Sequence, residues 1–338
     1  MPCDQAIYPL TFVPILRHYV WGGRNLETVL GRPLPPGITA ESWEISGHRS
    51  ASTRVEQGPW AGTPLPAVLA ALGERLVGRN AAKTLARDKF PLLVKILDAQ
   101  RNLSVQVHPD DAYALEHEGG DLGKVECWYV LHAEPNAELI YGLCKKVTPE
   151  AFAAAIADHQ LEALLQTLPI KAGDVVYLPA GTVHALKAGA MVIEIQQNSD
   201  STYRVYDWGR LGTDGKPRAL HVSKALDVID WDMVRPGLVQ PRLHAQVNGL
   251  ACWELVRCPQ FCLDRLTLAR GATYQGRCGG DTFQILGCLT GQATIAWAGG
   301  STSLEGVRFA LLPAALGDFA VEAQNACTLL RAWVPPGN

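Results

Sequence analysis

The 338-residue chain lacks several features that would place it in a special class of protein. No stretch approaches the ~20 apolar residues of a membrane span, and no basic segment followed by an apolar one opens the chain, so we expect a cytoplasmic protein. Its nine cysteines are odd in number and include no CxxC pair, which argues against a disulfide framework or a cysteine-type zinc knuckle. A net charge of −3 gives no excess of basic residues of the kind that binds nucleic acid or an anionic membrane.

Glycine and proline, in contrast, are plentiful: 32 Gly and 22 Pro separate short apolar runs, which is typical of a mainly β protein with many turns. Helix signals are few. The pair Thr148-Pro149 predicts an N-cap followed by an Ala/Leu-rich helix, and shorter helices are expected over 64–74 and 222–229. Strands are expected near 8–17, 41–47, 90–99, 103–108, 125–132, 174–178, 190–197 and 202–207.

The chain is long enough for two domains, because single cores rarely grow beyond roughly 250–300 residues. The segment 231–242 contains two prolines and little periodicity, which indicates a linker. We therefore expect domains at 1–236 and 237–338. Residues 175–184 and 309–318 share an apolar run, Pro-Ala and a turn, with Asp318 at the position of His184, so the second domain is expected to repeat the architecture without the metal.

One segment combines polar and apolar residues in strict alternation. Ser104, Gln106 and His108 share one face of a strand, and Val105 and Val107 share the other. Buried polar side chains are costly unless each has a partner, so a strand of this kind more often lines a site than a core.

Two other segments supply further metal donors. The pattern Gly173-Asp174-x4-Pro179-x-Gly181-x2-His184 indicates a strand, a Pro/Gly turn and a histidine that points inward, and Glu126 adds a carboxylate. Together with Gln106 and His108 these residues suit a divalent ion, zinc above all. Two alternatives stay open at this point: His184 as a hydrogen-bonded barrel histidine, and Glu126 as the ion-pair partner of Lys124.

The pattern at 173–184 resembles the second motif of the cupin fold, and longer stretches resemble class I mannose-6-phosphate isomerases of the short bacterial type. The matching stretches are LLVKILDAQRNLSVQVHPDD (92–111), GKVECWYVL (123–131), AGDVVYLPAGTVHAL (172–186) and EIQQNSDSTYRVYDWGR (194–210), with YVWGG (19–23) and ESWEISGH (41–48). The resemblance covers much of the first 210 residues. The chain differs from longer eukaryotic members of this family, which carry a helical domain between the strands that correspond to those of Glu126 and His184. The resemblance therefore does not predict the walls of the pocket.

The resemblance implies a fold of two cupin-like β jelly rolls with a few short helices, the first of them catalytic. It also implies one Zn²⁺ per chain, bound by Gln106, His108, Glu126 and His184. Arg204 is implied to be catalytic, and Lys95, Lys124 and Glu194 to line the pocket. We expect Lys124 and Glu194 to take part in catalysis, and Lys95, Ser104 and Arg204 to contact the substrate.

The implied reaction interconverts mannose 6-phosphate and fructose 6-phosphate through an enediolate that zinc and Arg204 stabilise. The base stays open among Glu194, metal-bound water and a histidine. Two rival functions are a non-haem metal oxygenase on the same fold and a non-catalytic sugar-binding cupin. The expected partner is a phosphosugar, and the expected state is a monomer or weak homodimer.

Overall fold

Short β-strands carry most of the regular structure in the computed structural model, which describes residues 6–212 and 215–337. The helices are α1 (Asn25–Thr28), α2 (Leu65–Leu72), α3 (Glu74–Val77), α4 (Ala82–Leu85), α5 (Asp111–His117), α6 (Pro149–Ala157) and α7 (Val222–Val228). Among the described residues, none of the helices has the length and apolar character needed to cross a membrane. The mainly β fold with short helices that the sequence predicts is confirmed.

The chain divides into two compact units, each assembled from separate segments. One unit contains the residues up to Ile15, then Trp43–Val94, then the residues from Val239 onward. The other contains Leu16–Ser42 and Lys95–Leu238. All nine predicted site residues fall in this second unit, which we call the site unit; the other is called the C-terminal unit.

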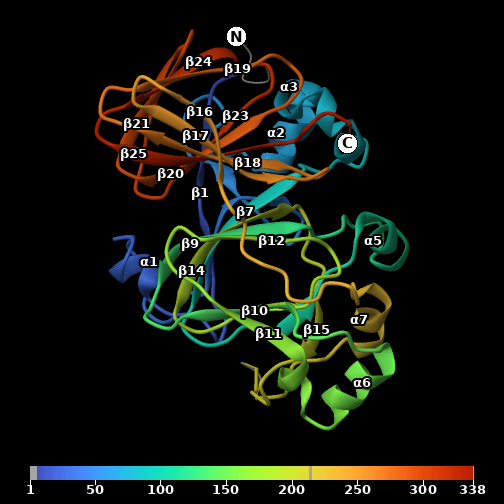
Figure 1. Cartoon of the computed structure of the whole chain (residues 1–338). Coiled ribbons are helices and arrows are strands. Elements are labelled where there is room, and N and C mark those ends of the chain that lie inside the picture. Colours follow the sequence, from blue (N-terminus) through green and yellow to red (C-terminus); the bar gives the residue numbers. More distant parts are fainter. Residues whose placement is uncertain (1–5, 213–214, 338) are drawn as a thin grey trace. The chain divides into compact units, whose positions relative to one another are not determined.

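Two sheets supply the strands of the site unit (Figure 1). The five-stranded sheet has the order β11-β10-β13-β8-β15, and the six-stranded sheet has the order β12-β9-β14-β7-β3-β2. The strands of the first are β8 (Val105–Val107), β10 (Glu138–Leu143), β11 (Leu165–Pro169), β13 (His184–Leu186) and β15 (Tyr203–Tyr206). Those of the second are β2 (Ile15–Arg17), β3 (Glu41–Ile45), β7 (Leu92–Ala99), β9 (Glu126–Ala133), β12 (Val175–Leu178) and β14 (Ala190–Gln197). Ile15 of β2, the last three residues of β3 and the first three of β7 belong to the C-terminal unit.

The pairing register of β13, β8 and β15 places three polar residues of the five-stranded sheet in one row. His184 on β13 lies opposite Gln106 on β8, and Gln106 lies opposite Arg204 on β15. Side chains of directly opposed residues project to the same face of a sheet. The row therefore brings together three residues that are far apart in the sequence.

The apolar residues of β8 fix which face the row occupies. Val105 and Val107 are fully buried in a cluster that includes Phe152 of α6 and Ala225 of α7. Burying a valine side chain is worth about 1.5–3 kcal/mol, and a one-residue slip of a strand would turn every side chain to the opposite face. Packing against α6 and α7 therefore holds Gln106 on the inner side.

Local sequence signals account for the helices near the site. The Thr148 hydroxyl accepts a hydrogen bond from the Ala151 N–H, 3.2 Å away, and Pro149 begins α6, as the sequence predicts. The Asp110 carboxylate accepts one from the Tyr113 N–H at 2.8 Å, which caps α5. Helix α5 was not among the helices expected from the sequence, and neither were α1, α3 and α4.

The C-terminal unit is built on an eight-stranded sheet, ordered β16-β17-β18-β25-β20-β23-β1-β6, and a four-stranded sheet, ordered β19-β24-β21-β22. Its strands are β1 (Leu10–Val13), β6 (Arg54–Val55), β16 (Arg242–Val247), β17 (Leu250–Arg257), β18 (Cys262–Leu268), β19 (Thr273–Cys278), β20 (Gln284–Thr290), β21 (Gln292–Trp297), β22 (Gly300–Glu305), β23 (Phe309–Leu312), β24 (Gly317–Ala323) and β25 (Cys327–Trp333), beside the pair β4 (Gly47–His48) and β5 (Ala51–Ser52).

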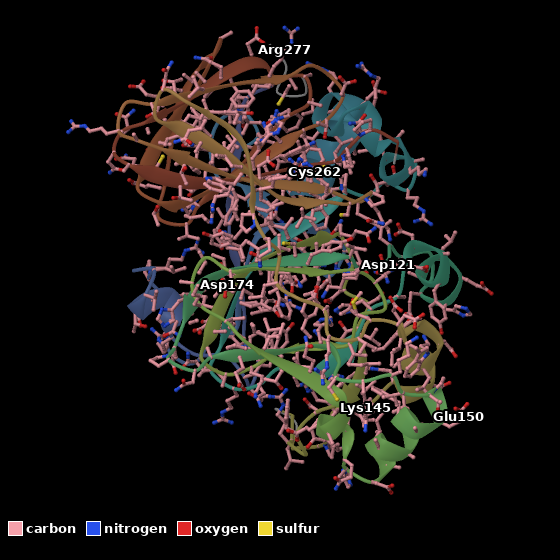
Figure 2. All side chains as sticks on the ribbon, in the orientation of Figure 1. Asp121, Lys145, Glu150, Asp174, Cys262 and Arg277 are labelled. Atoms are coloured by element: carbon pink, nitrogen blue, oxygen red, sulfur yellow. The ribbon has the colours of Figure 1, made fainter. Side chains whose placement is uncertain are left out.

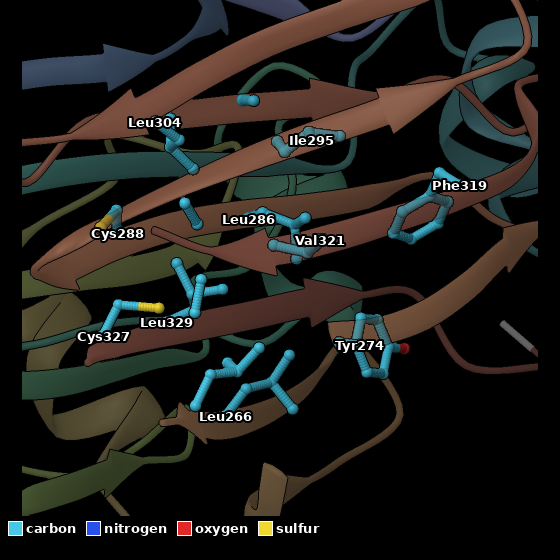
Figure 3. Close-up of a cluster of buried hydrophobic side chains, with 14 of the residues drawn as sticks. Leu266, Tyr274, Leu286, Cys288, Ile295, Leu304, Phe319, Val321, Cys327 and Leu329 are labelled. Carbon is cyan, nitrogen blue, oxygen red and sulfur yellow. The ribbon is translucent and has the colours of Figure 1, made fainter. Parts of the chain in front are cut away.

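Apolar side chains fill the C-terminal unit (Figure 3). Leu266, Leu286 and Leu329 of the larger sheet share a buried cluster with Ile295 and Val321 of the smaller one. Two facing sheets with an apolar interior make a jelly roll, and no helix interrupts the described residues beyond Val239, as expected.

The compact units differ in outline from the expected domains. The expected boundary at 236/237 lies close to the observed one after Leu238, but the unit that holds the C-terminal hundred residues also includes two earlier segments. The reason is strand pairing: Leu10 of β1 lies opposite Leu311 of β23, and Phe12 lies opposite Val55 of β6. An assignment of domains 1–236 and 237–338 to separate functions stays a prediction.

Candidate metal centre and substrate cavity

His108, Glu126 and His184 form one buried cluster in the site unit. One ligand atom from each lies within 4.8 Å of the others, and their side chains are at most 2% exposed. Glu126 Oε1 lies 2.9 Å from His184 Nε2 and 3.6 Å from His108 Nε2. Two imidazoles and one carboxylate at such distances are a donor set for a divalent transition metal.

The outer nitrogens of both imidazoles fix the side of each ring that is left for a metal. His108 Nδ1 lies 2.8 Å from the Ser201 carbonyl oxygen, and His184 Nδ1 lies 2.9 Å from that of Thr182. A carbonyl can only accept, so each Nδ1 carries the proton. Both Nε2 atoms therefore face the Glu126 carboxylate.

This arrangement fits a bound cation. The Glu126 carboxylate is fully buried, and neither oxygen accepts a hydrogen bond of good geometry, although Lys124 forms an ion pair with Oε2. Imidazole lone pairs that face a carboxylate repel it unless a positive charge lies among them. In addition, metal-binding histidines usually donate a hydrogen bond from their other ring N–H to a carbonyl or carboxylate, as both histidines do here. Burial and the nearby Lys124 ammonium lower the pKa of His108 to about 4, so this ring is neutral at pH 7.

Gln106 lies beside the cluster but is less tightly placed. Its amide nitrogen is 3.4 Å from His184 Nε2. The two ends of an amide are assigned from surrounding contacts, and a half-turn of the group would direct its oxygen toward the cluster. Gln106 is thus near enough to be the fourth donor that the sequence predicts.

Two lysines and a second carboxylate continue from the cluster. Lys124 Nζ lies 2.9 Å from Glu126 Oε2 and 4.0 Å from Glu194 Oε1, and Lys95 Nζ lies 3.3 Å from Glu194 Oε1. The Trp128 indole donates to Glu194 Oε2 at 2.9 Å. All four charged groups are at most 5% exposed, so the charges are tolerated because they alternate in sign.

The two carboxylates have different proton affinities. Burial alone would raise the pKa of Glu126, but the charges of Lys124 and His108 hold it well below its usual range. Burial, together with the negative charge of Glu126, raises the pKa of Glu194 despite the two lysines. Two neighbouring carboxyl groups with divergent pKa values are typical of sites that transfer protons.

A cavity of about 320 Å³ opens beside this group of charges. It is lined by Tyr19, Trp21, Glu41, Lys95, Leu97, Leu103, Ser104, Gln106, Lys124, Glu194, Asp200, Thr202, Arg204 and Arg218. The volume falls in the usual range for small-molecule sites. A hollow of about 420 Å³ in the C-terminal unit is lined without any charged residue, so it offers no comparable chemistry.

Six of the nine predicted site residues line this cavity: Lys95, Ser104, Gln106, Lys124, Glu194 and Arg204. His108, Glu126 and His184 do not line it, but each is within contact distance of Lys124 or Gln106, which do. The sequence indicated neither Arg218 nor the Trp128–Glu194 hydrogen bond, and it did not assign Trp21 to the site, although this residue also lines the cavity.

Comparisons with known proteins identify the family of this chain. The family described as phosphomannose isomerase type I, catalytic domain, matches residues 10–130. A Bacillus subtilis protein named mannose-6-phosphate isomerase ManA is 35% identical over 321 residues, which cover 94% of this chain and 97% of that protein. A Streptococcus mutans protein named mannose-6-phosphate isomerase is 39% identical over 287 residues, 85% of this chain and 86% of that one.

The fold of the chain agrees with that of a solved structure of a relative. A crystal structure of the mannose 6-phosphate isomerase from Bacillus subtilis superposes with a TM-score of 0.84 at 33% identity, over 96% of this chain and 99% of that one. Identity at this level over nearly the whole length of a relative confirms the resemblance that the sequence motifs carry. The chain therefore belongs to the type I phosphomannose isomerase family.

Proposed function

We propose that this chain interconverts mannose 6-phosphate and fructose 6-phosphate with one metal ion per chain. The observation that carries the proposal is the buried cluster of His108, Glu126 and His184 beside a cavity with cationic side chains. The names of the relatives favour the same reaction.

We propose zinc as the metal, with Gln106 as the fourth donor. Two imidazoles, a carboxylate and an amide oxygen suit zinc, whose N and O bonds measure about 2.0–2.2 Å. A bound zinc ion supplies a Lewis acid that polarises an oxygen of the substrate.

The chemistry asked of the protein's own residues is a proton transfer between neighbouring carbons. Removing the proton from C2 of the open-chain aldose develops negative charge on the C1 oxygen. The ketose forms when a proton returns to C1 and the proton of the C2 hydroxyl passes to the C1 oxygen. Arg204, on the row with Gln106 and His184, supplies fixed positive charge toward that oxygen. Lys124 and Lys95 are placed to hold substrate hydroxyls, as is Ser104.

We propose Glu194 as the group that moves the proton. Burial beside Glu126 raises its pKa, which brings the carboxyl nearer to the neutral range in which a general base works best. Trp128 and Lys95 hold its two oxygens in place. Among the described residues, its Oε1 is contacted only by the two lysine ammonium groups, Lys95 at 3.3 Å and Lys124 at 4.0 Å, and is the oxygen that we propose takes the substrate proton.

We extend the proposal to the setting of the enzyme. A negatively charged sugar phosphate is the expected partner, and the net charge of −3 means that the anion must be met by local positive charge. We propose a cytoplasmic enzyme, a monomer or weak homodimer, that engages neither nucleic acid nor membrane.

The direct test is turnover of mannose 6-phosphate by the purified protein, followed with a coupled assay for fructose 6-phosphate. His108→Ala should reduce turnover at least 100-fold, because removing one donor from a four-donor site weakens metal binding. His117→Ala is the matched control: His117 ends α5, and its side chain is 42% exposed, so this variant should keep full activity. A wild-type protein without isomerase activity, or an active His108→Ala, would contradict the proposal.

A further inference from the structure

Lys124 reaches the cavity from a segment that is buried but has no regular secondary structure. Residues 121–125 precede β9 and belong to no strand or helix, although every one of them is buried. The backbone N–H groups of a strand are paired by the neighbouring strand. Those of an irregular buried segment need other acceptors, because an unpaired buried N–H is costly. The acceptors of this segment therefore decide where Lys124 lies.

Three successive N–H groups of the segment each have an acceptor. The Gly123 N–H donates to Asp111 Oδ1 at 2.8 Å, and the Val125 N–H donates to Gln197 Oε1 at 3.0 Å. Between them, the Lys124 N–H donates to a backbone carbonyl at 2.9 Å. Two of the three acceptors are side chains, so the identities of residues 111 and 197 determine how firmly the segment is held.

These two side chains also bind each other, and we call the pair of Asp111 and Gln197 the clamp. The Gln197 amide nitrogen donates to Asp111 Oδ1 at 2.9 Å and to Oδ2 at 3.2 Å. An ionised carboxylate can only accept, so it fixes which end of the amide faces it and leaves the amide oxygen for the Val125 N–H. Gln197 is 5% exposed, and its own N–H donates to the Val125 carbonyl at 3.1 Å.

The segment also lies directly against the backbone at the start of α5. A Cβ at Gly123 would lie 2.4 Å from the Asp110 carbonyl carbon and 2.5 Å from the Asp111 nitrogen. Backbone in such close contact has little room to move independently. The clamp therefore joins the start of α5 and the end of β14 to the segment that carries Lys124.

The surroundings of the Lys124 ammonium group show why its placement matters. Its Nζ lies 2.9 Å from Glu126 Oε2, 3.2 Å from His108 Nε2 and 4.0 Å from Glu194 Oε1. Lysine has a flexible four-carbon stem, so its ammonium group is placed only as well as its backbone. A shift of about 1 Å would change its contacts with both carboxylates, and a misplacement of this size can cost about 10²-fold in rate.

We propose that Gln197, held by Asp111, is a positioning residue for Lys124. Neither member of the clamp lines the cavity, so the clamp acts through the backbone of residues 123–125. The inference rests on the function proposed above, because it concerns the placement of Lys124 in that same site.

Amide hydrogen exchange tests the clamp without any turnover. Gln197→Met removes the acceptor of the Val125 N–H, and Asp111→Ala removes that of the Gly123 N–H. Exchange at residues 123–125 should become at least about 10-fold faster in each variant, because local opening of the segment becomes easier.

Asp110→Ala is the matched control for both variants. Asp110 begins the same helix, but its carboxylate accepts from the Tyr113 N–H at 2.8 Å and not from the segment. This variant should speed exchange at Tyr113, leave exchange at residues 123–125 unchanged and alter kcat less than about threefold.

A double-mutant cycle, at matched metal content, separates positioning from general stability. Gln197→Met should lower kcat for mannose 6-phosphate about 10- to 100-fold and change KM less than about threefold. In a Lys124→Ala background the same substitution should lower kcat less than about twofold, because no lysine is left to misplace. Asp111→Ala should follow the same pattern with a smaller loss, since Asp111 is exposed, and it serves alone if Gln197→Met fails to fold.

The outcomes distinguish this assignment from the proposed function. Equal losses of kcat with and without Lys124, or unchanged exchange at residues 123–125, would overturn the assignment alone. A wild-type protein without isomerase activity would defeat the proposed function, and hydrogen exchange would still decide whether the clamp holds the segment.

Discussion

At the level of single residues, Arg204 differs from the lysines around it. No described carboxylate forms an ion pair with Arg204, and the residue lies opposite Gln106 in the strand register. A fixed positive charge so placed is worth most when negative charge develops on the substrate, because the site was organised before the reaction began.

This placement predicts a kinetic signature for Arg204→Ala. We expect kcat for mannose 6-phosphate to fall by roughly 10²–10³, the usual cost of removing one preorganised donor. Arg204→Lys keeps the charge but loses the planar fork, so it should recover only part of the loss. Steady-state kinetics of both variants provide the check, and an effect confined to KM would assign Arg204 to ground-state binding instead.

The residues of the site were predictable where side chains alternate or follow a turn motif. Spacing indicated Ser104, Gln106, His108 and His184; in the structure the first two line the cavity and the two histidines lie in the metal cluster. The groups that orient both histidines were not predictable, because they are backbone carbonyls of Ser201 and Thr182 and leave no pattern in the sequence. Arg218 was missed because it follows no strand or helix periodicity.

At the level of elements, the turn between β12 and β13 positions two of the candidate ligands. Gly181 has φ +84°, and its N–H donates to the His108 carbonyl at 2.9 Å. A Cβ at this position would lie 2.8 Å from the Val228 carbonyl oxygen, at the end of α7. The turn therefore requires glycine both for its conformation and for close approach.

Gly181→Ala should consequently disturb the fold and the metal site together. Gly173→Ala is a matched control, since Gly173 has φ +90° but a Cβ there would meet nothing closer than 4.0 Å. We expect Gly181→Ala to be less stable than this control by about 1–3 kcal/mol, the cost of overpacking, and to retain less metal. Thermal unfolding and metal analysis of both variants test this; equal behaviour would show that the close approach does not matter.

Strands with a clear period of two were the predictable elements. The expected strands at 103–108, 125–132 and 190–197 match β8, β9 and β14 within two residues. Strand β13 (His184–Leu186) contains one polar residue followed by two apolar ones, so no alternation can be read from it. Helix α5 was hidden because an aspartate after a strand is equally suited to end a turn and to cap a helix.

At the level of the whole chain, the segment pairing of the C-terminal unit could not be read from the sequence. Strand β1 pairs with β23, and such non-local pairing depends on complementary buried surfaces rather than on any local pattern. The repeat between 175–184 and 309–318 does correspond to a strand, a Pro-Ala turn and the next strand in each unit, β12 to β13 and β23 to β24.

The two copies of that repeat end in different surroundings. His184 begins β13 and is buried in the metal cluster. Asp318 on β24 is 78% exposed and lies 3.4 Å from Arg277. Figure 2 shows Arg277 at the outer surface of its unit. An exposed carboxylate paired with an arginine provides no closed donor set, so the whole chain should bind one metal ion.

Metal content per chain, measured by mass spectrometry in parallel with the initial rate on mannose 6-phosphate, tests the central claim most directly. The full-length protein should contain about one zinc ion. Dialysis against a strong chelator should remove the ion and the activity together, and added zinc should restore both in the same proportion. Full activity in protein that has been shown to hold no metal would contradict the account.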